Sequence, residues 1–326
     1  MDVSIVIPTK NGGELLDKVL SAVDQQKTKY SYEVICVDSG SSDNTLDIIK
    51  KHKCNLFEIL PADFGHGKTR NYGASKGSGE FIVFLTQDAI PASETWLEGF
   101  IDAIKSDDTV VGAFGKHLPY PDCNLLDKRD ITGYFESFGS ENVIYYMEDS
   151  ERYKNDESYR HSLAFFSDNN SCLRRCVWEK YPYADVNFAE DQIWARQMIE
   201  LGYKKMYCPF APVYHSHNYP LKTYFKRYFD EYKGLYELHG FQIVKHWYYT
   251  IPAAFKHTLS DVRYIRPLNM KRREKIYWAW YSLWRNMYRY IGGYLGGRYH
   301  SYSEKKQKRL DRRISQQYAQ RNGKKG

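Results

Sequence analysis

The segment EVICVDSGSSDNT, residues 33–45, combines the two patterns that decide the fold. Its first part, Glu33–Asp38, is a short apolar run, which predicts a strand buried on both faces. Its second part is rich in serine, glycine and aspartate, and the following residues Thr45–Lys53 have helical spacing. A strand that ends in a polar loop and continues into a helix is the repeating unit of a parallel sheet.

The same unit recurs on both sides of this segment. The other predicted strands are Val3–Pro8, Leu56–Leu60 and Glu80–Thr86, and the other predicted helices are Glu14–Gln25 and Lys68–Lys76. We therefore predict an α/β fold with a doubly wound, Rossmann-like parallel sheet. Ligands bind beyond the carboxyl ends of the strands in such sheets, which makes Thr9, Asp38–Asp43 and Thr86–Ala89 the first candidates for a site.

Beyond residue 110 the pattern is less regular. We predict strands near Val110–Lys116, Leu163–Ser167 and Lys204–Cys208, with helices near Trp178 and over Asp191–Leu201. From residue 221 onward the chain is helical, basic and aromatic, so we expect two regions, 1–220 and 221–326. The second region has 24 Lys and Arg against 7 Asp and Glu, whereas the first has 23 against 33. This asymmetry predicts that the second region faces an anionic partner.

Two helices of the second region are predicted to be amphipathic. Their apolar positions are Tyr224, Phe225, Tyr228, Phe229, Tyr232, Leu235 and Tyr236 on the first, and Ile276, Trp280, Leu283, Trp284, Met287 and Ile291 on the second. Basic residues beside tryptophan and tyrosine are typical of a helix on an anionic membrane surface. The alternative is that these helices pack on the rest of the protein or form a homo-oligomer.

The cysteines and the apolar runs bear on the compartment. No CxxC pair occurs among the six cysteines, which favours free, buried thiols in a reducing cytosol. The chain opens directly into a strand and has no run of 18 apolar residues, so we expect neither a signal peptide nor a spanning helix.

Two aspartates at strand ends allow more than one interpretation when read alone. Asp38 could accept hydrogen bonds from a base or ribose, or it could belong to a turn that precedes a helix. Asp88 could bind a divalent cation together with substrate phosphates, or it could be an exposed turn residue.

Five motifs occur in a characteristic order. They are SIVIPTKNG (4–12), VDSGSSDNT (37–45), KTRNYGA (68–74), FLTQDAIP (84–91) and AEDQIWARQMIELGY (189–203). Together they resemble the inverting family 2 glycosyltransferases, whose nucleotide-diphospho-sugar-binding domain has the GT-A fold, over about residues 1–220. GHGKTRNYGAS (65–75) followed by LTQDA (85–89) is similar to the bacterial rhamnosyltransferase branch, which uses dTDP-L-rhamnose.

The resemblance implies a role for each matching residue. The residues implied to bind the donor nucleotide are Pro8, Thr9, Asp38, Lys68, Arg70, Asn71 and Gln87. Asp88 matches the last aspartate of the family's DxD metal motif, whose first aspartate is replaced here by Thr86. Some relatives supply a metal-binding histidine later in the chain, which points to His215 and leaves His217 as the alternative. The implied cofactor is a divalent cation, Mg²⁺ or Mn²⁺.

The ED pair of the last motif carries the implied chemistry. Asp191 corresponds to the family's catalytic base, which removes a proton from the acceptor hydroxyl. Glu190 is implied to orient or bind the acceptor, and Asp168 could bind sugar hydroxyls. Two acids at the start of a helix could instead stabilise the helix dipole, and Asp168 could lie in a polar turn.

These residues together predict an inverting glycosyltransferase. We expect it to move a sugar, L-rhamnose in the narrower interpretation, from a nucleotide-sugar donor to a lipid-linked or cell-surface glycan acceptor. A UDP-hexose donor, a catalytically silent glycan-binding subunit and a nucleotidyltransferase are the alternatives. We expect a peripheral location at the inner face of a bacterial membrane. Nucleic acid is not an expected partner, because it leaves the sugar-nucleotide motifs unexplained.

Overall fold

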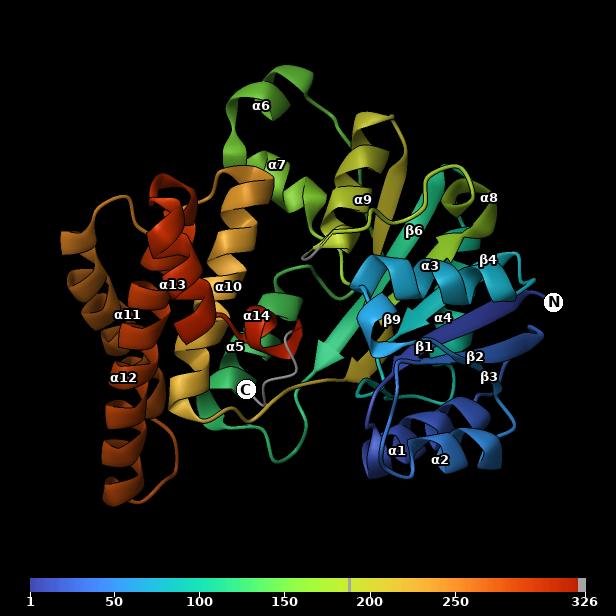
Figure 1. Cartoon of the computed structure of the whole chain (residues 1–326), viewed down its shortest axis with the longest axis horizontal. Coiled ribbons are helices and arrows are strands. Elements are labelled where there is room, and N and C mark those ends of the chain that lie inside the picture. Colours follow the sequence, from blue (N-terminus) through green and yellow to red (C-terminus); the bar gives the residue numbers. More distant parts are fainter. Residues whose placement is uncertain (187–188, 322–326) are drawn as a thin grey trace. The chain divides into compact units, whose positions relative to one another are not determined.

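A computed structural model describes residues 1–186 and 189–321 of the chain. Two compact units are present (Figure 1). The first comprises residues 1–123 and 127–216, and the second comprises residues 124–126 and the chain from His217 onward.

The first unit is built on one mixed β-sheet. In spatial order its strands are β3 (Asn55–Glu58), β2 (Tyr32–Asp38), β1 (Val3–Thr9), β4 (Phe81–Leu85), β8 (Asn170–Arg174), β6 (Val110–Leu118), β9 (Lys204–Tyr214) and β5 (Ile90–Pro91), with β7 (Val143–Tyr145) also paired to β9. The first four strands are parallel, as predicted. β8 runs antiparallel to both of its neighbours, β4 and β6, so the sheet is not parallel throughout.

Helices cover both faces of the sheet because the strands are apolar on both sides. On one face, α1 (Gly13–Asp24), α2 (Thr45–Lys51) and α4 (Trp96–Lys105) pack on strand residues such as Ile5 and Val83. On the other face, α3 (His66–Lys76) and α9 (Glu190–Glu200) pack on residues such as Val6 and Phe84. The remaining helices of this unit are η1 (Pro61–Asp63), α5 (Leu125–Glu136, whose first two residues belong to the second unit), α6 (Ser150–Asn155), α7 (Glu157–Ala164) and α8 (Arg175–Trp178).

Two local predictions about the first unit are wrong. Leu163–Ser167 is not a strand, because α7 extends to Ala164 and Phe166 then enters the core. The real strand, β8, was missed because its sequence NSCLR is half polar. Its polar Asn170 is nevertheless fully buried, since its side chain accepts a hydrogen bond from Trp96 Nε1 (2.9 Å) and donates one to the carbonyl of Ala211 (2.8 Å). All six cysteines are free thiols, but Cys176 is exposed rather than buried.

The second unit is helical, as predicted. Its helices are α10 (Leu221–His239), η2 (Trp247–Tyr249), α11 (Thr250–Ile265), α12 (Arg272–Gly297), η3 (Tyr299–Ser301), α13 (Glu304–Ile314) and α14 (Gln316–Arg321). α12 packs against both α10 and α11. Across the described ranges, none of the helices combines the length and the apolar character needed to cross a bilayer.

Candidate active site

The loop after β2 is organised around the buried carboxylate of Asp38. One oxygen accepts hydrogen bonds from the backbone N–H groups of Gly40 (2.9 Å) and Ser41 (2.8 Å), and the other accepts from the hydroxyl groups of Ser41 and Thr9. Gly40 has φ +89°, and a Cβ atom there would lie 2.8 Å from Pro61 Cγ, so only glycine fits. Asp38 therefore fixes the shape of this loop. Its predicted contact with a nucleotide stays a prediction, and that contact would replace one of these bonds.

Gln87 connects the loop after β4 to the loop after β1. Its side chain accepts from the backbone N–H of Lys10 (2.8 Å) and donates to the Lys10 carbonyl (3.1 Å). The neighbouring Thr86 donates its backbone N–H to the carbonyl of Asn169, just before β8 (3.1 Å). The Thr86 hydroxyl is buried and has no hydrogen-bond partner among the described residues. The ends of β1, β2 and β4 and the start of β8 thus meet at one edge of the sheet.

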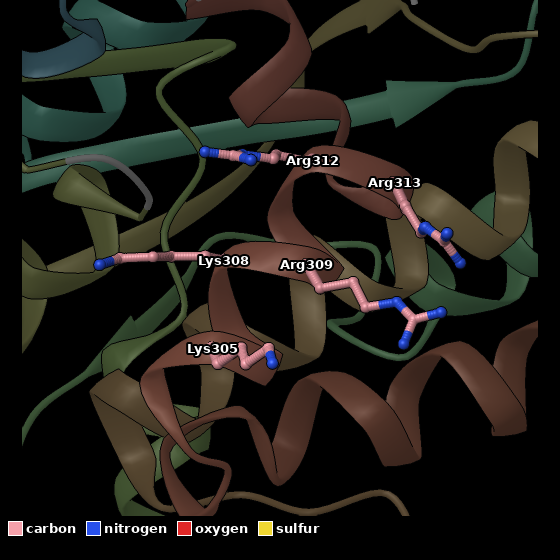
Figure 2. A pocket seen from close by; sticks show the side chains of 5 residues that line it. All are labelled: Lys305, Lys308, Arg309, Arg312 and Arg313. Atoms are coloured by element: carbon pink, nitrogen blue, oxygen red, sulfur yellow. The ribbon is translucent and has the colours of Figure 1, made fainter.

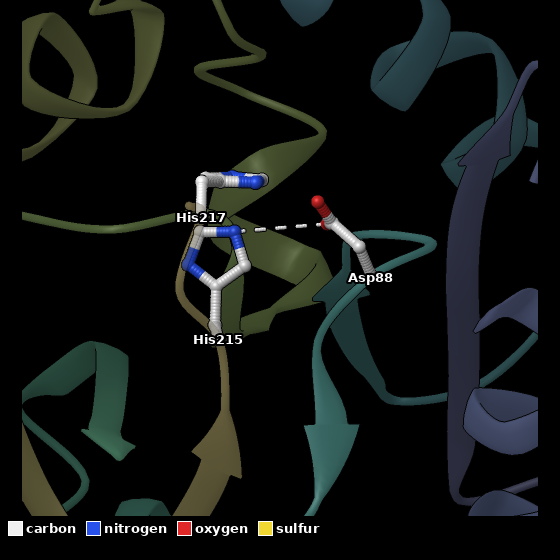
Figure 3. Close-up of side chains that lie close together, drawn as sticks. All are labelled: Asp88, His215 and His217. Carbon is white, nitrogen blue, oxygen red and sulfur yellow. Dashed lines mark ion pairs between the residues drawn. The ribbon is translucent and has the colours of Figure 1, made fainter. Parts of the chain in front are cut away.

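Asp88 and His215 lie close together at the same edge (Figure 3). Ile90 in β5 pairs with Tyr214 in β9, which brings the adjacent segments together. As a result, His215 Nε2 lies 3.6 Å from Asp88 Oδ1. His217 follows two residues later, and one potential ligand atom from each of the three residues lies within 4.8 Å of the others. One carboxylate with two imidazoles suits Mn²⁺ better than Mg²⁺, which prefers oxygen ligands. The structure therefore groups both histidines of the prediction with Asp88.

Arg70 lies at the centre of a buried acidic cluster. Its Nε is 3.0 Å from Asp168 Oδ2 and its Nη1 is 3.2 Å from Glu190 Oε1, and all three side chains are buried. α3 and α9 pack on the same face of the sheet, which brings together residues 120 positions apart in the chain. Burial, followed by the negative charge of Asp168, raises the pKa of Glu190 well above its usual range, although Arg70 opposes that shift.

Asp191 is held beside this cluster in the first turn of α9. Its carboxylate oxygens accept hydrogen bonds from the backbone N–H groups of Asp168 (3.1 Å) and Gln192 (2.8 Å). Burial, and after it the negative charge of Asp168, raises the pKa of Asp191 to about 7. The preceding Ala189 has φ +57°, a left-handed conformation that is uncommon for residues other than glycine and often marks functional sites. A carboxylate with such a pKa suits a general base at neutral pH.

Arg70 and Asn71 were predicted to approach the nucleotide, but each has partners inside the protein. The Asn71 amide donates to the carbonyl of Tyr183 (2.8 Å) and accepts from Trp178 Nε1 (2.9 Å) and the Tyr183 N–H (3.1 Å). These bonds of Asn71, and the contacts of Arg70 with Asp168 and Glu190, favour a positioning role for both residues. Lys68 is 53% exposed, with its amine 3.9 Å from Asp63, and Pro8 is half-buried in β1.

Sequence reasoning missed two buried residues near Asp191. The Tyr183 hydroxyl is buried and has no hydrogen-bond partner among the described residues, and burial raises its pKa well above its usual range. The Lys205 amine donates to the Phe165 carbonyl, and burial lowers its pKa well below the ordinary value. Neither lies in one of the five motifs, so only the three-dimensional packing identifies them.

Two solved sugar transferases have a similar fold. The poly(ribitol-phosphate) transferase TarS of S. aureus (residues 1–349) aligns with 98% of this chain and 81% of its own at a TM-score of 0.55 and 14% identity. Glucosyl-3-phosphoglycerate synthase of Mycobacterium tuberculosis, solved with Mn²⁺, UDP and its product, covers 73% of this chain and 80% of its own at a TM-score of 0.52 and 14% identity. These similarities establish the fold.

The sequence establishes the family. The fold and the site define a glycosyltransferase of the GT-A type. The chain belongs to glycosyl transferase family 2, whose family model matches residues 4–179. It is 35% identical over 237 residues to the O-antigen chain rhamnosyltransferase RfbN of Salmonella typhimurium, covering 71% of each chain.

Proposed function

We propose that this protein transfers L-rhamnose from dTDP-L-rhamnose to a hydroxyl group of a lipid-linked or cell-surface polysaccharide precursor, with inversion at the anomeric carbon. One observation carries the proposal. A carboxylate with a pKa near 7, in the first turn of α9, and a carboxylate–imidazole group suited to a divalent cation lie at the same edge of the sheet. The similarity to RfbN, an O-antigen chain rhamnosyltransferase, supports the donor sugar and the class of acceptor.

Asp191 is the proposed general base. It takes the proton from the acceptor hydroxyl as that oxygen attacks the sugar from the side opposite the leaving diphosphate. The N–H groups of Asp168 and Gln192 hold the Asp191 carboxylate in place, and Arg70 holds Asp168. Asp168 and Glu190 stay candidates for the acceptor side of the site.

Asp88 and His215, with His217 as a further ligand, would hold a divalent cation. A bound cation would offset the negative charge that develops on the diphosphate as it leaves. Pro8, Thr9, Asp38, Lys68 and Gln87 are the proposed neighbours of the nucleotide. Pro8, Thr9 and Asp38 lie at the ends of β1 and β2, Gln87 follows β4, and Lys68 lies in the first turn of α3.

The first test is a donor screen. We expect dTDP-L-rhamnose to be the preferred donor and UDP-hexoses to be poor donors, because RfbN, which is 35% identical over 71% of this chain, is a rhamnosyltransferase. Release of dTDP or UDP from a panel of nucleotide sugars measures this preference. A clear preference for a UDP-sugar would contradict the rhamnosyl assignment and leave the family membership intact.

The rate of transfer should rise with pH through about 7. The base acts only in its ionised form, and Asp191 becomes ionised as the pH passes its pKa of about 7. Because the Arg70 charge lowers that pKa, Arg70→Met should move the inflection of the pH–rate profile upward. The same profile for Glu200→Gln, an exposed change at the other end of α9, serves as the control. A rate independent of pH between about 5.5 and 8.5 would contradict this role for Asp191.

We also propose that the protein is cytoplasmic and attaches peripherally to the inner face of a bacterial membrane. α13 is rich in exposed basic side chains, among them Lys305, Lys308, Arg309, Arg312 and Arg313 (Figure 2). Lys308 and Arg312 point to one side of the helix while Arg309 and Arg313 point to the other, which suits a diffuse negative surface better than a single phosphate. Each basic residue near such a surface contributes about 1 kcal/mol of attraction.

A further inference from the structure

α12 has large apolar residues on the face that points away from the protein. Ile276, Trp280 and Trp284 are 61%, 50% and 43% exposed. Its inward face carries Ser282, Arg285 and Asn286, all at most 2% exposed, beside the buried Tyr281. Three residues of the apolar stripe predicted from the sequence therefore face away from the protein.

Polar contacts and glycines explain why the inward face of α12 packs well. The carboxylate of Asp261 in α11 accepts hydrogen bonds from Ser282 (2.6 Å) and Asn286 (2.9 Å). On the side facing α10, a Cβ atom at Gly292 would lie 2.7 Å from the carbonyl oxygen of Phe225, so the two helices approach at backbone distance. Small residues and buried polar pairs between helices, with apolar residues outside, are features of packing in a lipid environment.

α11 and the turn before it repeat the pattern. Ile251, Phe255 and Leu259, spaced four residues apart, are between 48% and 58% exposed. Trp247 precedes them and is 67% exposed. We call the exposed apolar residues of these segments the apolar outer face. It consists of Trp247, Tyr248, Tyr249, Ile251, Phe255, Leu259, Ile276, Tyr277, Trp280 and Trp284.

The charges around the apolar outer face favour an anionic partner. Residues 247–284 contain seven Lys and Arg against two Asp and Glu, and the basic residues flank the apolar ones. Lys256 and Arg263 lie in α11, and Lys271, Arg272 and Arg273 lie at the start of α12, all of them exposed. A second copy of the chain would bring like charges together, whereas an anionic lipid surface complements them. Six of the ten residues are tryptophan or tyrosine, the side chains that favour the headgroup level of a bilayer.

We propose that the apolar outer face inserts into the boundary between headgroups and acyl chains of an anionic bilayer. α11 and α12 then lie in the plane of the membrane and do not cross it. This inference rests on the proposed attachment to a membrane, and it adds insertion of apolar residues of α11 and α12 to the attraction supplied by the charges of α13. Insertion of apolar side chains survives high salt, whereas attraction between exposed charges is screened.

Vesicle flotation of the full-length protein tests this proposal. The vesicles contain phosphatidylglycerol and phosphatidylethanolamine, and flotation is measured at about 0.05 M and about 0.5 M salt. Wild type should keep part of its binding at high salt, and its tryptophan emission should shift to the blue on binding. Trp280→Glu with Trp284→Glu should lower the fraction bound about tenfold or more at both salt concentrations. Lys308→Glu with Arg312→Glu should affect only the binding that salt screens, and Phe210→Glu, a 51% exposed aromatic of the first unit, should have no effect.

Two results would overturn the proposal. The first is unchanged flotation of the tryptophan variant, and the second is a stable wild-type dimer that this variant dissociates, which would make the face a surface for self-association. Sedimentation velocity and thermal unfolding of each variant check oligomeric state and folding, and the milder Ile276→Ser with Trp280→Ser replaces any variant that unfolds. Donor turnover of the same proteins in solution separates this inference from the proposed chemistry. If wild type floats normally but does not turn over the donor, the result counts against the transferase proposal alone. Insertion predicts that the tryptophan variant loses flotation and keeps normal turnover.

Discussion

Asp191→Asn should abolish sugar transfer while leaving the fold and donor binding nearly unchanged. The amide has nearly the same shape as the carboxylate and can still accept one of the two backbone hydrogen bonds from Asp168 and Gln192. It cannot take up the proton of the acceptor hydroxyl, and a well-placed base contributes about 10²–10⁴-fold to the rate. Initial rates of nucleoside diphosphate release with acceptor, and donor affinity by calorimetry, measure the two halves of this expectation.

Glu200→Gln is the matched control for this change. It removes a carboxylate from the same helix, but this one is exposed and paired with Arg196 (2.8 Å), away from the cluster. It should keep wild-type turnover. Wild-type turnover in purified Asp191→Asn would remove Asp191 from the mechanism, and loss of donor binding together with turnover would indicate a structural role.

Transfer should require a divalent cation, and Asp88→Ala should weaken both donor binding and turnover. Asp88 supplies the carboxylate of the group formed with His215 and His217. A metal ion at a leaving diphosphate contributes several kcal/mol, so its removal should slow transfer by about 10²-fold or more. Turnover after EDTA treatment, and its recovery on titration with Mn²⁺ or Mg²⁺, measure this requirement.

Asp102→Ala is the control for the metal variant, because Asp102 is an exposed aspartate of α4 paired with Lys29. It should need no more metal than wild type. His215→Ala should shift the metal concentration at half-maximal activity to a higher value and leave the donor preference unchanged. Full turnover after exhaustive EDTA treatment would rule out the metal role of both Asp88 and His215.

The parallel half of the fold could be predicted because its strands are apolar on both faces and lie close in sequence. Phe81–Leu85 is buried throughout and Val3–Thr9 is buried except at Pro8, and each strand ends in a polar loop. β8 could not be found in this way, because Asn170 and Ser171 read as a loop until Trp96 and Ala211 are seen to satisfy the asparagine side chain.

In the candidate site, too, the sequence motifs identified single residues, whereas the contacts between them depend on three-dimensional packing. The resemblance gave Asp88 and His215 a metal role and Asp191 the role of base, and the structure puts Asp88 and His215 close together in loops and Asp191 in the first turn of α9. The resemblance could not show that Arg70 pairs with Asp168 and Glu190, because that contact joins segments about a hundred residues apart. The outward direction of Ile276, Trp280 and Trp284 in α12 was also hidden, because a stripe of apolar residues in a sequence reveals a helix face and not the direction in which it points.

The central position of β8 also determines the order in which this sheet can be completed during synthesis. β4 leaves the ribosome with all five residues of its FIVFL sequence destined for burial, but its partner β8 ends 89 residues later, at Arg174. At about 5–20 residues per second, the edge of β4 waits roughly 5–20 s for a pairing strand. An apolar edge strand is a template for aggregation. Nascent chains that stop before Asn170 should therefore aggregate when released, whereas chains that extend past Tyr214 should stay dispersed, which light scattering can measure. In the cell, the protein spends these seconds as an open sheet, and its yield should depend on how fast residues 86–174 are translated.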